Sequence, residues 1–410
     1  MFKMRIPFPN PLGSVQKLPR DLKILFLSFF VWSFGYGLYN YVWPIFLREL
    51  DADPGQVGLV LSIGFLAIAA TMIPGAILAN KYELRILLII GWALTLPVPL
   101  LYYFARTWTD VIPGIILFQL TGFNVPAFNA YIAGVGKRRT SGANFGIVWA
   151  SAPLGFVFSP AVGGLLLDWI SIREIFLLSF ILFAVSAVVL FWMKIQPPLP
   201  DDSRRNRLEI PKTVPETTLL LVLTGAAVAF SMASPFLPLF FQDIVKLTPS
   251  TIQYLGSVQA LGQTAFAIFL GRRADARGGG GAMALGLLVS ASGLAGLVIT
   301  RNLLFALPLV FLFGSARASS YIGYSILGGN RPGKSRAGQY GFYLTFESLG
   351  FVAGSYLGGF YYSINQQTGF VIAVVLFLLF ALAATFVGFR AEKPSMREAE
   401  KISEAVVVPR

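Results

Sequence analysis

Long apolar stretches constrain the fold of this chain more than any other feature of its sequence. A helix that crosses a bilayer needs about 20 mostly apolar residues, because the hydrocarbon core is ~30 Å thick and a helix rises ~1.5 Å per residue. Twelve stretches meet this condition, at 22–47, 56–79, 86–105, 111–135, 143–167, 172–194, 218–242, 251–270, 282–300, 302–328, 338–362 and 369–390. The sequence therefore predicts an all-α polytopic membrane protein with twelve transmembrane helices.

The composition supports a membrane location for most of the chain. Hydrophobic residues make up 56% of the sequence and charged residues 12%, whereas soluble proteins carry roughly a quarter charged residues. A soluble core could not bury so much apolar surface. The absence of Cys and His excludes disulfides, thiolate metal sites and imidazole proton shuttles, and no metal or other cofactor is expected.

The positive charges alternate along the chain in a way that predicts its orientation. Of the 32 Lys and Arg residues, 26 fall in the termini and every second loop, five fall in the other loops, and Arg317 lies inside a span. The positive-inside rule then places both termini in the cytoplasm of a cell membrane. Because the net charge of +13 is spread over short loops, lipid is the expected partner and nucleic acid is not. No cleavable signal peptide is expected.

An internal repeat divides the chain in two. Leu154-Gly155-Phe156-Val157 recurs as Leu349-Gly350-Phe351-Val352, and the same offset of 195 relates Gly163-Gly164 to Gly358-Gly359 and Pro54 to Pro249. We expect an N-terminal six-helix bundle at 1–195, a cytoplasmic Pro-rich linker at 196–217, a C-terminal six-helix bundle at 218–390 and a cytoplasmic tail at 391–410. Parallel repeats of this kind imply a pseudo-twofold axis along the membrane normal, with the site between the halves near the midplane.

Three short motifs carry a family resemblance. They are Leu78-Ala79-Asn80-Lys81 followed by Arg85, the second-half copy Arg273-Ala274-Asp275-Ala276-Arg277, and Gly155-Phe156-Val157-Phe158-Ser159-Pro160-Ala161-Val162-Gly163-Gly164. With the twelve-span layout, they resemble the major facilitator superfamily of secondary transporters over residues 20–390. The third motif is similar to one associated with exporters in that family. Asn80 stands where the family has an acid, and Ser159 where the exporter motif has a glycine.

The glycines of the fifth span predict close helix contacts. Gly155, Ser159 and Gly163 fall four residues apart, and Gly350 and Gly354 repeat this spacing in the eleventh span. Such stripes let a neighbouring backbone approach closely, either for packing alone or as the seam along which the halves rock. Pro160 is expected to bend the fifth span.

Asp275, the acid of the second-half loop motif, has two interpretations. By the repeat symmetry, Asp275 would face the start of the fifth span near Gly142 and Asn80 the start of the eleventh near Gly338. Both would then stabilise the outward-facing state at a helix N-terminus. Alternatively, Asp275 pairs with Arg272 or Arg277 within its own loop.

Arg317 and Glu347 are the two charges well inside predicted spans, at similar depth on consecutive helices. Buried charges in a membrane are expected to face the interior and to have a partner. Three interpretations follow: a structural ion pair, a proton-coupling Glu347 that competes for Arg317, or an Arg317 that binds an anionic substrate group.

Other polar and aromatic residues could line a substrate cavity, on helices that do so in the resembled family. They are Tyr36, Tyr39, Asn40, Gln119, Asn124, Gln259, Gln263, Tyr321 and Tyr324. An aromatic pocket with one acid and one base suits an amphipathic organic solute.

The sequence as a whole predicts a monomeric secondary active transporter that works by alternating access. Proton-coupled export of an organic, drug-like or amphipathic solute is the first interpretation. A proton-coupled importer or exchanger of an organic anion or sugar is the alternative. An enzyme is not expected, because the spans hold no Cys, His or paired acids. A primary pump is excluded because the chain has no phosphate-binding loop.

Overall fold

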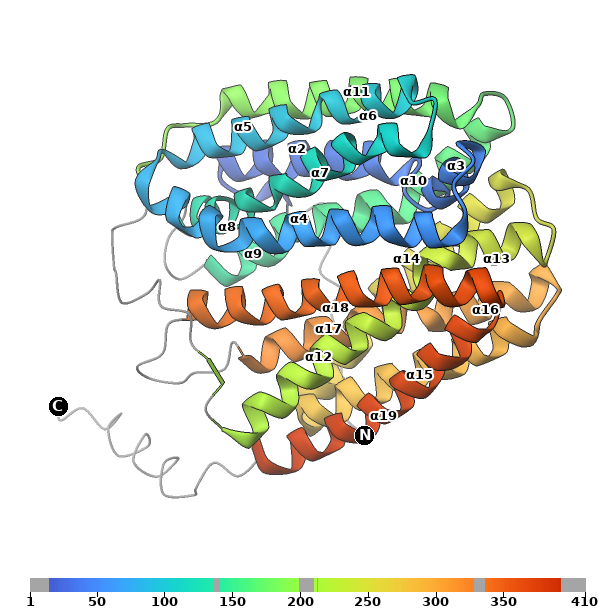
Figure 1. The fold of residues 1–410 in the computed structure, drawn as a ribbon. Coiled ribbons are helices and arrows are strands. Elements are labelled where there is room, and N and C mark those ends of the chain that lie inside the picture. The colour runs from blue at the N-terminus through green and yellow to red at the C-terminus, as the bar shows by residue number, and fades with distance from the viewer. Residues whose placement is uncertain (1–14, 136–140, 199–209, 212, 328–335, 392–410) are drawn as a thin grey trace, which may run out of the picture.

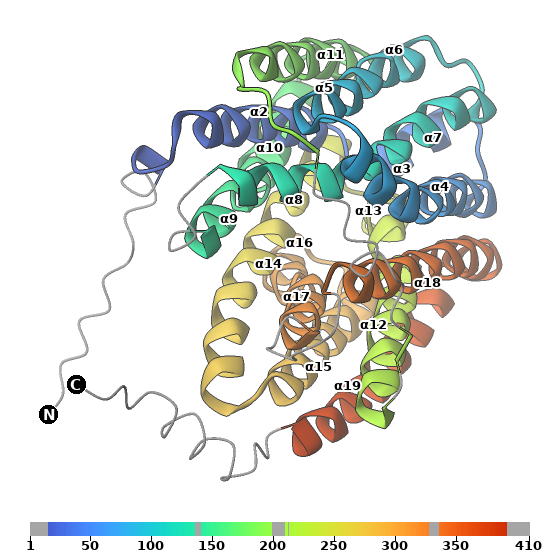
Figure 2. The ribbon, with the colours of Figure 1, turned by 90° about the vertical axis from the view of Figure 1, so that its left-hand side faces the viewer.

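In the computed structural model, helices form all the regular structure of the described residues, which are 15–135, 141–198, 210–211, 213–327 and 336–391. A first group of helices comprises α2 (Arg20–Gly37), α3 (Trp43–Glu49), α4 (Pro54–Lys81), α5 (Leu84–Thr95), α6 (Pro97–Phe104), α7 (Ile112–Leu120), α8 (Asn124–Gly134), α9 (Ser141–Trp149), α10 (Ser151–Leu167) and α11 (Ile172–Val189). A second group comprises α12 (Val214–Ala233), α13 (Leu237–Asp243), α14 (Pro249–Arg277), α15 (Gly279–Ile299), α16 (Leu303–Phe313), α17 (Ser315–Leu327), α18 (Arg336–Ile364) and α19 (Thr368–Ala391). The two groups form two layers, one above the other (Figures 1 and 2).

Nine helical stretches within the described residues are long and apolar enough to cross a membrane. The predicted spans outside this set coincide with α2 and α3, with α14 and with α18. The 29-residue helices α14 and α18 pack against the first group, α14 along α10 and α18 along α4. A helix covered by other helices needs less apolar surface than one that faces lipid. The count of twelve spans stays a prediction.

Several predicted spans are interrupted where the sequence contains proline. The first span breaks between Gly37 and Trp43, and Pro44 lies at the start of α3. The fifth span is interrupted at Ala150, because Pro153 has no N–H to donate to the carbonyl of Trp149 and its ring crowds that carbonyl. Pro160, where a bend was expected, lies inside α10.

The internal repeat is visible in the backbone at one end of each group. Asp51 and Lys246 both have φ of 62°, and they are 195 residues apart. Two residues later, Asp53 and Thr248 accept hydrogen bonds from the first turns of α4 and α14, respectively. Pro54 and Pro249 then begin these helices, because a proline at the first helical position loses no hydrogen bond. The same turn therefore precedes α4 in the first group and α14 in the second.

The glycine stripes approach neighbouring backbones, but mainly within their own group. A Cβ on Gly155 would come within 3.0 Å of the Phe34 nitrogen in α2, and one on Gly350 within 2.5 Å of the Thr224 carbonyl in α12. Close contacts between the groups come from glycines that follow these stripes along α10 and α18. A Cβ on Gly164 would lie 2.9 Å from the Ser250 carbonyl, and one on Gly359 would lie 2.4 Å from the Pro54 carbonyl. The stripes thus pack each bundle. Gly164 and Gly359 lie where α10 meets α14 and where α18 meets α4, and these two contacts between the groups are called the seams.

The seams are tight at one end and open at the other. At the end where α4 and α14 begin, called the closed end, the Ser62 hydroxyl donates to the Val352 carbonyl at 2.9 Å. At the opposite end, the open end, a Cβ added to Gly146, Gly271 or Gly341 would meet no atom within 4 Å. Among the described residues, the groups therefore contact each other at the closed end, and these three glycines at the open end have open space around them.

Two glycines of α14 give a matched test of packing. A Cβ on Gly262 would lie 2.0 Å from the Phe311 carbonyl of α16, whereas Gly271 has open space around it. We expect Gly262→Ala to lower the free energy of unfolding by roughly 1–3 kcal/mol and Gly271→Ala to leave it unchanged or raise it slightly. Melting temperatures of the purified variants in detergent check this. Equal melting temperatures would contradict the α14–α16 contact.

Candidate functional site

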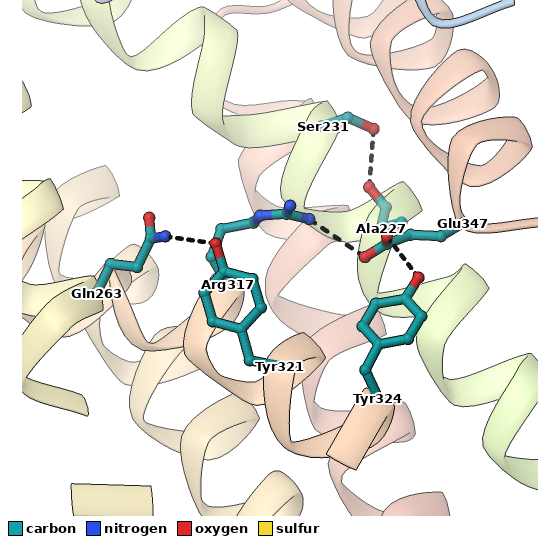
Figure 3. A network of polar contacts seen from close by, with 7 residues as sticks. All are labelled: Ala227, Ser231, Gln263, Arg317, Tyr321, Tyr324 and Glu347. Atoms are coloured by element: carbon teal, nitrogen blue, oxygen red, sulfur yellow. Dashed lines mark hydrogen bonds and ion pairs between the residues drawn. The ribbon is translucent and has the colours of Figure 1, made fainter. Parts of the chain in front are cut away.

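The structure brings Arg317 and Glu347 together as an ion pair. Arg317 Nη1 lies 3.2 Å from Glu347 Oε1, and the Tyr324 hydroxyl donates to Glu347 Oε2 at 2.7 Å. Figure 3 shows both contacts, with Arg317 and Tyr324 on α17 and Glu347 on α18. The side chain of Glu347 is 5% exposed and that of Arg317 is 27% exposed. The carboxylate is therefore buried between two donors, and the Arg317 side chain remains partly exposed.

Aromatic rings surround the guanidinium. The Cζ atom of Arg317 lies 5.8 Å from the ring centroid of Phe230, 5.9 Å from that of Tyr321 and 5.1 Å from that of Phe351. These distances are within the range of cation–π attraction. Phe351 also stacks on Phe65 of α4, with ring centroids 5.0 Å apart. The pair thus sits next to the α4–α18 seam.

A close helix approach positions the rest of the site. A Cβ on Gly314, just before α17, would lie 2.4 Å from the Gln259 carbonyl of α14. This approach allows Gln263 of α14 to donate to the Tyr321 hydroxyl at 3.0 Å (Figure 3). Gln259 instead donates to Ser234 Oγ at 3.3 Å. Gln263, Tyr321 and Tyr324 therefore join the ion pair, and Gln259 bonds a neighbouring helix.

The predicted cavity residues of the first group are placed differently. Tyr36 is half-buried against Phe118, with ring centroids 4.6 Å apart. Tyr39 is 1% exposed and packs edge-on against Phe176, so it belongs to the core of its own group. Asn40 is exposed in the break between α2 and α3, and Gln119 is half-buried.

Asn124 is buried within the first group. It is 4% exposed, and its side-chain amide fills the space beside Gly91 of α5. Asn124 was expected to line the cavity, but it packs against α5, since its amide lies where a Cβ on Gly91 would be.

One seam residue was not anticipated from the sequence. Gln253 of α14 is fully buried, and its Nε2 donates to the carbonyls of Gly37 and Leu38 at 2.9 and 2.8 Å. Its Oε1 accepts a hydrogen bond from the Val42 nitrogen at 3.1 Å. The break between α2 and α3 leaves these backbone groups without helical partners. One side chain of the second group therefore satisfies three backbone groups of the first.

A family model described as Major Facilitator Superfamily matches the chain twice, over residues 25–220 and 219–409. Together the matches cover most of the sequence. The chain belongs to the major facilitator superfamily.

Relatives in this superfamily support the assignment at low identity. The chain is 26% identical to an uncharacterized MFS-type transporter of Methanocaldococcus jannaschii over 44% of this chain and 47% of that protein. It is 25% identical to the multidrug resistance protein MdtG of Rahnella over 62% of this chain and 63% of that protein. It thus spans less than two thirds of these two relatives. A multi-drug resistance efflux pump PmrA homolog of Lactococcus lactis is 21% identical over 90% of this chain and 95% of that protein.

Solved structures show the same fold. A bacterial homolog of the human lysosomal transporter Spinster, in an inward-facing and occupied conformation, superimposes with a TM-score of 0.69 at 15% identity, over 89% of this chain and 96% of that one. The human organic anion transporter MFSD10 (TETRAN) does so with a TM-score of 0.65 at 16% identity, over 89% and 99%. With the family match and the candidate membrane spans, the chain is a multi-pass membrane protein of a family that carries small molecules.

The superfamily loop motifs lie at the open end. Arg85 donates to the carbonyl of Phe191, and Lys81 lies over the Tyr82 ring at 5.6 Å. Asn80 is half-buried, and Asp275 and Arg277 are exposed. Among the described residues, no ion pair joins Asp275 to Arg272 or Arg277, and the structure does not describe what surrounds Gly142 and Gly338. Arg85 thus bonds the turn at 190–192 that follows α11, and the pairing of Asp275 with Arg272 or Arg277 is not formed among the described residues.

Proposed function

We propose that this chain is a secondary active transporter that works by alternating access and exports an amphipathic organic solute, coupled to protons through Glu347. The observation that carries the proposal is the buried Arg317–Glu347 pair beside the seam, at 3.2 Å. An ion pair in a membrane bundle is costly to bury. A structural pair needs no access to solvent, whereas Arg317 is 27% exposed.

The unequal ends of the two seams support alternating access. The groups contact each other at the closed end through Ser62, Gly359 and Gln253. With the positive-inside orientation, the open end faces the cytoplasm and the described state is inward-facing. The halves are then the predicted bundles at 1–195 and 218–390. Of the predicted linker, 199–209 and 212 lie outside the described residues, as does the tail from 392 on.

Export and proton coupling are supported by different observations. Two relatives are named as multidrug resistance or efflux proteins, and the glycines of α10 resemble the exporter motif. Glu347 is the one acid that the described residues place against the ion-pair site, and it would carry the proton. Asp275 and Asn80 would stabilise the outward-facing state, in which the open end closes. The protein would act as a monomer and would not be an enzyme.

Proton-coupled import or exchange of an organic anion or sugar is a second candidate. The accessible charge of the pair is the cation, which favours an anion as its ligand. A solved structure of similar fold is an organic anion transporter.

Counterflow in proteoliposomes tests the proposed transport. A thermal-shift screen first selects binding compounds, since a ligand raises the melting temperature by mass action. Liposomes preloaded with an unlabelled compound are then expected to accumulate the labelled one, with saturation as its concentration rises. A conductance that does not saturate would indicate a pore and contradict the proposal. Failure of every bound compound to exchange would contradict it as well.

A further inference from the structure

The two side chains of the Arg317–Glu347 pair differ in how far they are exposed. The Glu347 side chain is 5% exposed, and each of its oxygens already accepts a hydrogen bond, from Arg317 at 3.2 Å and from Tyr324 at 2.7 Å. A cationic solute would have to displace both donors from a buried carboxylate. The pair is therefore poorly arranged to bind a cation.

The guanidinium of Arg317 is arranged in the opposite way. Its side chain is 27% exposed, and Glu347 is its one acceptor among the residues that the structure describes. A guanidinium carries further N–H groups in a planar fork that matches a carboxylate. Arg317 therefore has both the accessibility and the donors to bind a second acidic group.

The surroundings of Arg317 are aromatic. Phe230, Tyr321 and Phe351 lie around its Cζ atom at 5.1 to 5.9 Å, and Tyr321 is 44% exposed. The rings hold the guanidinium in place and offer apolar contacts to the body of a ligand. Figure 3 shows Gln263 bonded to Tyr321 on the side away from Glu347. An acid with an aromatic or apolar body fits both features.

We infer that the solute is an organic anion with an apolar or aromatic body, and that its acidic group takes the place of Glu347 on the Arg317 guanidinium. This inference rests on the proposed transport only for the statement that the bound compound is carried. It gives the solute a negative charge, which the proposed export of an amphipathic solute leaves open. It favours the second candidate, a transporter of an organic anion.

Displacement of Glu347 has a consequence for protons. A carboxylate that is 5% exposed and loses its cation would be a buried charge without a partner, which is costly. Taking up a proton removes the charge, and the neutral acid can keep its contact with Tyr324. The anion and one proton would then bind together and move in the same direction.

Few other ionisable groups lie near Glu347. On the packed elements α4 and α19, the described side chains include one charge, Lys81, at the exposed end of α4. On α12 the acid is Glu216, in the first turn of the helix, where its carboxylate accepts from the Thr213 nitrogen at 3.4 Å. On α17 the groups are Arg317, Tyr321 and Tyr324. Arg317 is therefore the cation that pairs with Glu347, and Glu347 would take up a proton when it loses this partner.

A matched set of ligands tests the inference. Phenylbutyrate, phenylbutylamine and phenylbutanamide share one body and differ in charge. Calorimetric titration of the purified protein, in buffers of different ionisation enthalpy, measures affinity and proton uptake together. We expect the acid to bind at least about tenfold more tightly than the amine or amide and to bind with proton uptake. Tighter binding of the amine, or binding of the acid without proton uptake, would overturn the inference.

Variants locate the binding group. Arg317→Gln is expected to weaken binding of the acid by at least about tenfold, and Arg317→Lys to recover part of the loss. Glu347→Gln should bind the acid without proton uptake. Arg272→Gln, an exposed arginine at the open end, is the matched control and should bind normally. Unchanged affinity in Arg317→Gln would contradict the assignment.

Counterflow with the same compounds separates the two proposals. If the acid binds through Arg317 but is not exchanged, the transport proposal fails and the anion site stands. If the amine or amide is exchanged and the acid does not bind, transport stands and the inference fails.

Discussion

Proton-gradient-driven accumulation of solute should fall to the level of protein-free liposomes when Glu347 is replaced by Gln. The amide keeps the shape of the carboxylate and an acceptor for Arg317, but it cannot carry a proton. Counterflow, which needs no proton gradient, should persist. The measurement is uptake of the labelled solute into proteoliposomes under a pH gradient of either polarity.

A control and a stability measurement keep this result interpretable. Glu49→Gln, an exposed glutamate at the closed end, should accumulate solute as the unmodified protein does. Glu347→Gln leaves the guanidinium with a weaker partner, so we expect its free energy of unfolding to fall by about 1–3 kcal/mol. Normal accumulation in a folded Glu347→Gln protein would show that another group carries the proton.

The second large effect is expected at the closed end, where Gln253→Leu should shift the protein towards an outward-open state. In the closed seam, leucine would leave the carbonyls of Gly37 and Leu38 and the nitrogen of Val42 without the partners they have now. An unpaired buried group costs about 1–3 kcal/mol, whereas in the open state water can satisfy all three. A shift of about 3 kcal/mol would change the ratio of the two states roughly a hundredfold.

The absence of cysteine in the chain makes this shift easy to measure. A cysteine at Ser355, which is fully buried against the α4–α18 seam, should react with maleimide applied from the closed end much faster when Gln253 is replaced. Gln259→Leu is the matched control, because Gln259 lies on the same helix and bonds within the second group. Equal labelling in the two variants would mean that Gln253 does not hold the seam.

The central pair could be predicted from the sequence, whereas Gln253 could not. Arg317 and Glu347 interrupt apolar stretches, and a charge inside a membrane must find a partner at its own depth. Gln253 bonds backbone groups more than 200 residues away, and those groups are free only because the first span breaks. Pro44 lies next to that break, but nothing in the apolar pattern of 22–47 relates it to Gln253, so the partner of Gln253 was not visible.

Side-chain direction was the least predictable feature of the site. Tyr39 and Asn124 were expected in the cavity, but they pack inside the first group. A helix in a bundle is apolar on most faces, so sequence periodicity does not separate the face towards a cavity from the face towards a neighbour. For the same reason, the glycine spacing predicted a close backbone approach, which the structure has, but not that α2 and α12 would be the partners.

We propose that the two groups of helices rock against each other around the Arg317–Glu347 pair, and paired distance measurements test this motion most directly. Spin labels at Glu49 and Ser363 would report on the closed end, and labels at Lys81 and Arg272 on the open end; all four residues are exposed. On addition of a transported solute, we predict a population of molecules in which the Glu49–Ser363 distance is longer and the Lys81–Arg272 distance is shorter. The same fraction of molecules should show both changes. Two distances that lengthen together, or that stay fixed while solute is carried, would contradict the account.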